Sequence, residues 1–147
     1  MKFFSIAAVA FLLDISVSFE LIDDDNASRN NPQIPVLNSK FGMKCHTNNL
    51  YNAETIKQNV DEAHNNVRFI TQLEQGSFTR FPGVVLYSYF IGKSYVAEQV
   101  YYASNYIIID SSGVFVAGMI SIPDNDRTAY KVCKFTEGTE YATYRQL

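Results

Sequence analysis

The chain has 147 residues, with 12 Lys or Arg, 15 Asp or Glu and a formal net charge of −3 at pH 7. A mildly acidic chain is a poor general binder of nucleic acid, because phosphate contacts are made mainly by Lys and Arg. The chain has no Trp but 10 Tyr and 11 Phe, and tyrosine-rich strands suit a sheet with one solvent-exposed face. A chain of this length favours one folded domain with a sizeable core.

The first 18 residues have the pattern of an export signal. Lys2 gives a short positive region, and residues 3–13 are apolar apart from Ser5. Ser16 and Ser18 are small residues at the −3 and −1 positions of a cut after Ser18. The apolar run is shorter than the roughly 20 residues that a bilayer span requires. We therefore predict a cleaved signal peptide over 1–18 and no membrane span, with a buried N-terminal helix as the alternative.

Residues 19–40 are predicted to be a disordered linker or pro-segment. They contain three consecutive aspartates at 23–25, together with Pro32 and Pro35, and show no sustained hydrophobic period. Within them, residues 26–28 form an N-glycosylation sequon, which makes Asn26 a predicted modification site.

A helix is predicted over about 53–74. Asn52 can cap its first turn, and Glu54 favours the positive end of the helix dipole. Gly76 is suited to end it. Apolar residues spaced three and four apart form one stripe, namely Ile56, Val60, Ala63, Val67 and Ile70.

The chain after Gly76 reads as a succession of strands. Gly92-Lys93, residues 110–113 and residues 123–126 are predicted turns or loops. The predicted strands are 84–91, 94–102, 106–109, 114–122 and 129–135. One helix followed by a strand meander indicates an α+β fold.

Cys45 and Cys133 are predicted to form a disulfide. In an exported chain, a pair of cysteines indicates a disulfide before a metal site or a nucleophile. No close Cys/His cluster accompanies them, so we predict no metal site. The bond would join the segment before the helix to the last strand. The chain-entropy model gives about 4.5 kcal/mol for closing such a loop, as an upper figure.

Several short motifs occur in a characteristic order. They are FGMKC at 41–45, LY at 50–51, FPG at 81–83, YIIID at 106–110, AGMI at 117–120 and VCKFTEG at 132–138. In this order they resemble the small secreted fungal ribonucleases that cleave after guanine. They are closer to the RNase-like proteins associated with haustoria, the catalytically inactive relatives in powdery mildew fungi. Met43 departs from that effector family, which usually has an aromatic residue two positions before the first cysteine.

The resemblance implies a microbial-ribonuclease-like domain over 41–138. The implied fold has one long helix packed on an antiparallel sheet and one disulfide. Residues 139–147 would form a C-terminal tail, either disordered or added as an edge strand.

The resemblance also implies that the catalytic set is absent. Active members of the family need a base, an acid and a cation that holds the phosphate. Glu98 lies near the position of the base. The strand after Ala117-Gly118 ends in Ile122 where the acid histidine would be. Tyr106 stands in place of the arginine, and Gly83 in place of a second histidine. His46 and His64 lie elsewhere and are expected to be solvated or partly packed.

The function that the resemblance implies is that of a secreted virulence effector delivered into plant cells. It would bind a host protein or RNA and be detected by plant immune receptors. Predicted contact residues are Tyr87, Tyr89, Lys93 and Tyr95, with Arg80 and Lys93 as phosphate contacts; ordinary packing is the alternative for the tyrosines. We expect a monomer without cofactors. Alternatives are an RNA-binding pseudoenzyme, an active secreted ribonuclease and an inhibitor or structural protein of unrelated fold.

Overall fold

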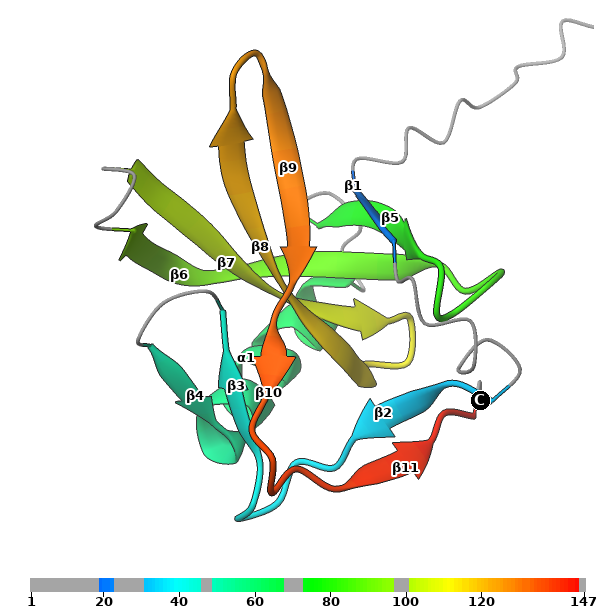
Figure 1. Ribbon diagram of the computed structural model, residues 1–147. Helices are drawn as coiled ribbons and strands as arrows, with labels where there is room; N and C mark the ends of the chain where they lie inside the picture. Colours follow the sequence, from blue (N-terminus) through cyan, green and yellow to red (C-terminus); the bar gives the residue numbers. More distant parts are fainter. Residues whose placement is uncertain (1–18, 23–30, 46–48, 68–72, 97–100, 146–147) are drawn as a thin grey trace, which may run out of the picture.

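The computed structural model describes residues 19–22, 31–45, 49–67, 73–96 and 101–145. The predicted signal peptide, the sequon at Asn26, His46 and Glu98 lie outside these residues. The described part contains eleven strands and one helix (Figure 1). They are β1 (Phe19–Leu21), β2 (Gln33–Pro35), β3 (Gly42–Lys44), β4 (Leu50–Asn52), α1 (Ala53–Val67), β5 (Glu74–Phe78), β6 (Leu86–Val96), β7 (Tyr101–Asp110), β8 (Phe115–Asp124), β9 (Arg127–Val132), β10 (Lys134–Phe135) and β11 (Tyr141–Thr143).

The described strands form three sheets. The largest has the order β1-β5-β6-β7-β8-β9, in which β1 runs parallel to β5 and the other neighbours are antiparallel. A second sheet has the order β10-β3-β4, and a third pairs β11 with β2. The chain passes from the first sheet to the second at Cys133, between β9 and β10.

The expected α+β fold, with one long helix packed on an antiparallel sheet, is wrong. The described chain is mostly strand, spread over three sheets with one parallel pairing, and α1 has only 15 residues. Its start is as predicted, because Asn52 Oδ1 accepts a hydrogen bond from Thr55 N at 2.9 Å. Its predicted end is wrong: Gly76, expected as a helix stop, is a strand residue that pairs with Leu86. Strand pairing at Gly76 took precedence over the helical spacing of the preceding apolar residues.

The predicted turn at Gly92-Lys93 is also wrong. A single 11-residue strand, β6, passes through this point with a shift of register between Phe90 and Gly92. The strand predicted over 94–102 is therefore divided between β6 and β7. The glycine that suggested a turn instead accommodates a bulge, which is its other frequent role inside a strand.

The prediction of a disordered linker over 19–40 is wrong where the structure describes it. Phe19 and Leu21 are buried in β1, and Pro35 is buried at the end of β2. Three-residue strands are too short to show a hydrophobic period, so no sequence pattern predicts them. Of the two alternatives for the tail after Gly138, the structure shows the added strand, because β11 pairs with β2.

The core lies on both sides of the large sheet. One cluster contains Ile56 and Ala63 of α1 with Ile107 and Ile109 of β7, and it includes both cysteines. The second cluster, on the opposite side, contains Phe19, Leu21, Phe78, Phe81, Leu86, Ile108, Val116, Ala117, Met119 and Tyr144. The two sets alternate along β7, which explains why Ile107, Ile108 and Ile109 are all buried.

The predicted disulfide is confirmed, with Cys45 and Cys133 Sγ atoms 2.02 Å apart and Cα atoms 4.4 Å apart. It covalently joins the end of β3 to the crossing between β9 and β10. Among the described elements, the helix is too short and too polar to cross a membrane.

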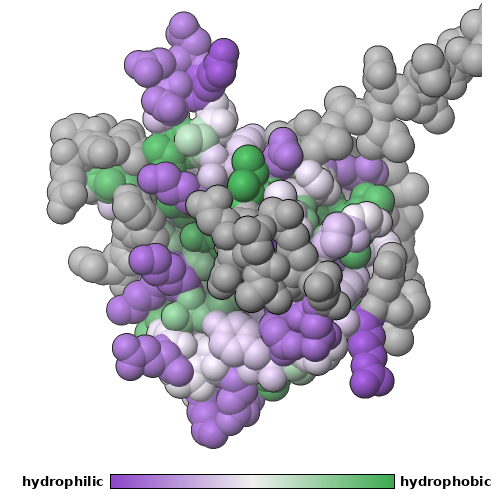
Figure 2. All heavy atoms as spheres, turned by 45° about the vertical axis from the view of Figure 1, so that its right-hand side comes forward, coloured by the Kyte–Doolittle hydropathy of each residue, from purple (hydrophilic) through white to green (hydrophobic). Residues whose placement is uncertain are grey.

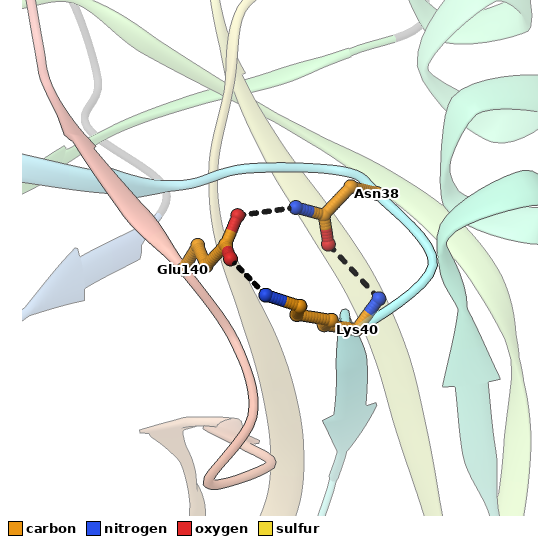
Figure 3. A network of polar contacts seen from close by, with 3 residues as sticks. All are labelled: Asn38, Lys40 and Glu140. Atoms are coloured by element: carbon orange, nitrogen blue, oxygen red, sulfur yellow. Dashed lines mark hydrogen bonds and ion pairs between the residues drawn. The ribbon is translucent and has the colours of Figure 1, made fainter.

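A polar network connects the loop after β2 to the segment before β11 (Figure 3). Asn38 Nδ2 donates to Glu140 Oε2 at 2.7 Å, and Lys40 Nζ forms an ion pair with Glu140 Oε1. The Lys40 hydrogen bond and charge hold the pKa of Glu140 below its ordinary value. Both charged side chains are solvent-exposed, so the network orients two loops and adds little to stability.

Candidate binding surface

Aromatic side chains gather on one side of the β6–β7 hairpin. Phe90, Tyr95 and Tyr102 are 49%, 51% and 64% exposed, which is unusual for large apolar rings. Tyr95 pairs directly with Tyr102 and their ring centroids lie 5.2 Å apart. Phe90 pairs with Tyr106 at 5.8 Å, edge to face. We call Phe90, Tyr95, Tyr102 and Tyr106 the aromatic face.

The bulge in β6 creates this surface. Tyr102, Ser104 and Tyr106 alternate along β7 and therefore point to one side of the sheet. Their β6 partners are Tyr95, Lys93 and Phe90, respectively. In a strand with strict alternation, Phe90 would point to one side of the sheet, and Lys93 and Tyr95 would point to the other. The bulge shifts the alternation by one residue and brings all three to the same side.

A buried polar group fixes the backbone at this bulge. Asn105, fully buried, is the partner of Gly92, and its Nδ2 donates to Ser94 Oγ at 2.6 Å and to Tyr51 Oη at 2.8 Å. Gly92 has φ of 151°, a conformation that side-chain-bearing residues rarely adopt. These contacts hold the two halves of β6 in their observed register.

The predicted contact residues do not form one surface, because they lie on both sides of the large sheet and in a turn. Tyr87 and Tyr89 lie on the helix side of the sheet, packed against the cluster that contains Ile56. Tyr89 Oη donates to Glu62 Oε2 of α1 at 3.1 Å, and burial together with that bond raises the Tyr89 pKa. Arg80 lies over the Phe78 ring at 5.2 Å, in the turn after β5. Of the predicted contact residues, Tyr95 belongs to the aromatic face, and Lys93 lies on the same side of the sheet.

Phe90, Tyr102 and Tyr106 were missed as binding residues by sequence reasoning. The alternation of Tyr102, Ser104 and Tyr106 was a detectable signal for one exposed side of a strand. It was obscured because the strand was predicted to end at Tyr102.

Few charges accompany the aromatic face. Among the described residues that strand register places on this side of the sheet, Lys93 is the one cation, and the acids are Glu74, the partner of Ser88, and the buried Asp110, the partner of Leu86. The Tyr130 pKa is raised by burial, by the charge of Glu74 and by Tyr106. The aromatic face therefore carries no excess of positive charge.

Hydrophilic side chains gather instead at the tip of the β8–β9 hairpin, uppermost in Figure 2. Residues 123–128 at this tip are all exposed. Among the described residues, no group of three His, Cys, Asp or Glu side chains could hold a metal ion.

The residues that were compared with the catalytic residues of active ribonucleases do not lie together in the structure. Ile122 is buried in β8, whereas Gly83 is exposed in a turn before β6. Tyr106 belongs to the aromatic face. His64 is partly buried on α1, and its Nδ1 has no hydrogen-bond partner among the described residues.

The structure also contains an apolar cavity of about 380 Å³ beside β5. It is bordered by residues 75–79 and by residues 81–85, and Val85 at its margin is half exposed. Comparisons with protein-family models, with curated proteins and with solved structures found no match to this chain.

Proposed function

We propose that this protein is an exported, catalytically inactive virulence effector that binds a host plant protein through its aromatic face. The sequence motifs, rather than the fold, support the effector assignment. The N-terminal pattern and a disulfide suited to an oxidising compartment support export. Delivery into host cells and detection by plant immune receptors belong to the same proposal.

The aromatic face is the observation that carries the binding role. Tyr and Phe are enriched at protein–protein interfaces. A few central residues carry most of the binding energy there, and Tyr is enriched among them. A paired strand fixes the Tyr95 and Tyr102 backbones, so little conformational entropy is lost when a partner covers the rings. Exposed aromatic clusters on a folded domain commonly mark such surfaces.

Charge favours a protein over a nucleic acid as the partner. Binding to single-stranded RNA combines base stacking with a positively charged groove. Lys93 is the single described cation that strand register places on this side of the sheet, and the chain as a whole has a net charge of −3. Stacking without phosphate neutralisation gives weak RNA binding.

The binding proposal is tested with a double substitution, Tyr95→Ala with Tyr102→Ala, in tagged protein used for a pull-down from plant leaf extract. Host proteins that dock on the aromatic face should be depleted at least tenfold, because the two most exposed rings of that face are gone. The matched control is Tyr141→Ala, which removes another half-exposed tyrosine on β11. Equal recovery of all partners by both variants would contradict the proposal.

RNA binding is the second candidate, because the same exposed rings can stack on bases. It predicts a gel shift that weakens steeply as salt rises, and loss of the captured partners when the extract is treated with RNase. Catalytic inactivity predicts no cleavage of total RNA by the purified protein. Turnover that disappears in Glu98→Gln would instead identify an active ribonuclease.

A further inference from the structure

The first described strand is a short arm seated on the edge of the large sheet. In β1, Phe19 and Leu21 are 2% and 1% exposed, whereas Glu20 between them is exposed. The arm runs parallel to β5, with Phe19 opposite Gly76 and Leu21 opposite Phe78. Figure 1 shows β1 lying along the outer edge of β5.

The site that holds this arm is shaped for an aromatic ring. A Cβ atom at Gly76 would lie 2.4 Å from the Phe19 ring, so only glycine leaves room for it. The ring of Tyr130 in β9 also lies near it, with its centroid 6.4 Å from that of the Phe19 ring. Phe78, two residues after Gly76, is the backbone partner of Leu21, and Ser77 lies between them.

Main-chain contacts complete the site. Thr79 N donates to Leu21 O at 2.9 Å, continuing the β1–β5 pairing by one residue. Strand addition to a sheet edge obtains affinity from such backbone bonds and specificity from alternate side chains. Here the alternate positions accept one aromatic and one aliphatic side chain, and the intervening residue faces solvent.

The pairing has features of an exchangeable strand. It involves three residues, and parallel pairing is slightly less stable per residue than antiparallel pairing. The cavity beside β5 is lined by Gly76, Ser77 and Phe78, the three residues of this edge that pair with the arm.

We infer that the edge of β5 is a peptide-binding groove, occupied here by the chain's own Phe19–Leu21. When the arm leaves, the groove takes an extended peptide of a partner protein with the sequence aromatic-any-aliphatic, in parallel register with β5. This inference rests on the proposed function only in that a partner protein supplies the peptide. The groove is distinct from the aromatic face.

The test uses the full chain with Phe19→Ala and Leu21→Ala, which empties the groove. The probe is a fluorescein-labelled synthetic peptide, Phe-Glu-Leu-Ile-Asp-Asp, followed by fluorescence anisotropy. Saturable binding should be at least tenfold tighter to this variant than to the unaltered chain. In the unaltered chain the tethered arm competes at a high effective concentration. Glu20→Ala is the matched control and should bind the peptide no better than the unaltered chain.

Two further controls define the groove. A peptide with alanine in place of its Phe and Leu should not bind. Adding Gly76→Ala to the emptied variant should abolish binding, because the new Cβ occupies the place of the ring. Absence of binding to a variant whose near-ultraviolet circular dichroism is native would overturn the inference.

Hydrogen exchange on the unaltered protein tests exchangeability even where the emptied variant does not fold. The Thr79 amide should exchange through local opening, at least tenfold faster than the amide of Ile108 in the sheet centre. Equal protection of the two amides would show that β1 leaves only on global unfolding, and would overturn the inference. Loss of host partners from the Tyr95→Ala and Tyr102→Ala variant reports on the proposed function separately.

Discussion

At the scale of single residues, the most consequential polar contact is between Asp110 and Tyr144. Tyr144 Oη donates to Asp110 Oδ2 at 2.7 Å, and the Tyr144 ring packs edge to face on Phe81. The other carboxylate oxygen of Asp110 accepts from the backbone amides of Ser112 and Val114. Asp110 is 3% exposed, so its oxygens depend on these donors.

Tyr144→Phe should lower the free energy of unfolding by about 1–3 kcal/mol, because it leaves a buried carboxylate oxygen without a donor. Urea denaturation of the variant and the unaltered protein measures the difference. Tyr141→Phe, which alters an exposed ring on the same segment, should change stability by less than about 0.5 kcal/mol. Equal effects of the two substitutions would contradict the assignment.

The same contact predicts a dependence on alkaline pH. Burial, the hydrogen bond to Asp110 and the charge of that carboxylate raise the Tyr144 pKa above its ordinary value of 10.0. The folded protein thus holds this proton more tightly than the unfolded chain. The resulting stabilisation is complete below pH 10 and is lost as pH rises further. The difference in stability between the unaltered protein and Tyr144→Phe should therefore diminish above pH 10.

At the scale of elements, the bulge in β6 decides which side chains the protein presents. It places Lys93 and Tyr95 beside Phe90, while Ser94 and Val96 remain buried. A strand with strict alternation would present the opposite set.

Gly92→Ala should lower the free energy of unfolding by about 1–3 kcal/mol, because a residue with a side chain is strained at φ of 151°. The nearest atom to an added Cβ is Tyr51 Oη at 3.7 Å, so the effect is conformational rather than steric. Urea denaturation checks this, with exposed Lys93→Ala expected to change stability by less than about 0.5 kcal/mol. A Gly92→Ala variant as stable as the lysine control would argue against a strained bulge.

At the scale of the whole molecule, the disulfide reinforces a junction that strand pairing also makes, because Lys134, next to Cys133, pairs with Lys44, next to Cys45. It spans 88 residues of sequence and ties β3 to the crossing between the large sheet and the β10-β3-β4 sheet. Both cysteines belong to the core cluster that also contains Ile56 of α1.

Replacing both cysteines by alanine should cost about 2–4 kcal/mol, because the unfolded chain regains the freedom of a long loop. The measurement is urea denaturation of the double variant. The unaltered protein treated with a reductant should lose a similar amount. A midpoint that responds to neither treatment would show that the bond contributes no net stability.

The sequence by itself determined features that depend on neighbouring residues or on context. Asn52 could be identified as a helix cap from its own side chain, and the two cysteines as a pair from the predicted export signal. The strand around Tyr106–Asp110 followed from its apolar run.

The tertiary structure decided the rest. Strands β1, β2 and β11 exist because distant segments pair, and three residues carry no period of their own. The start of β5 at Glu74 and the passage of β6 through Gly92 were likewise set by pairing with strands elsewhere in the chain. A local sequence pattern indicates which secondary structures a segment can form. Long-range hydrogen bonding and burial determine which of those structures the folded protein contains.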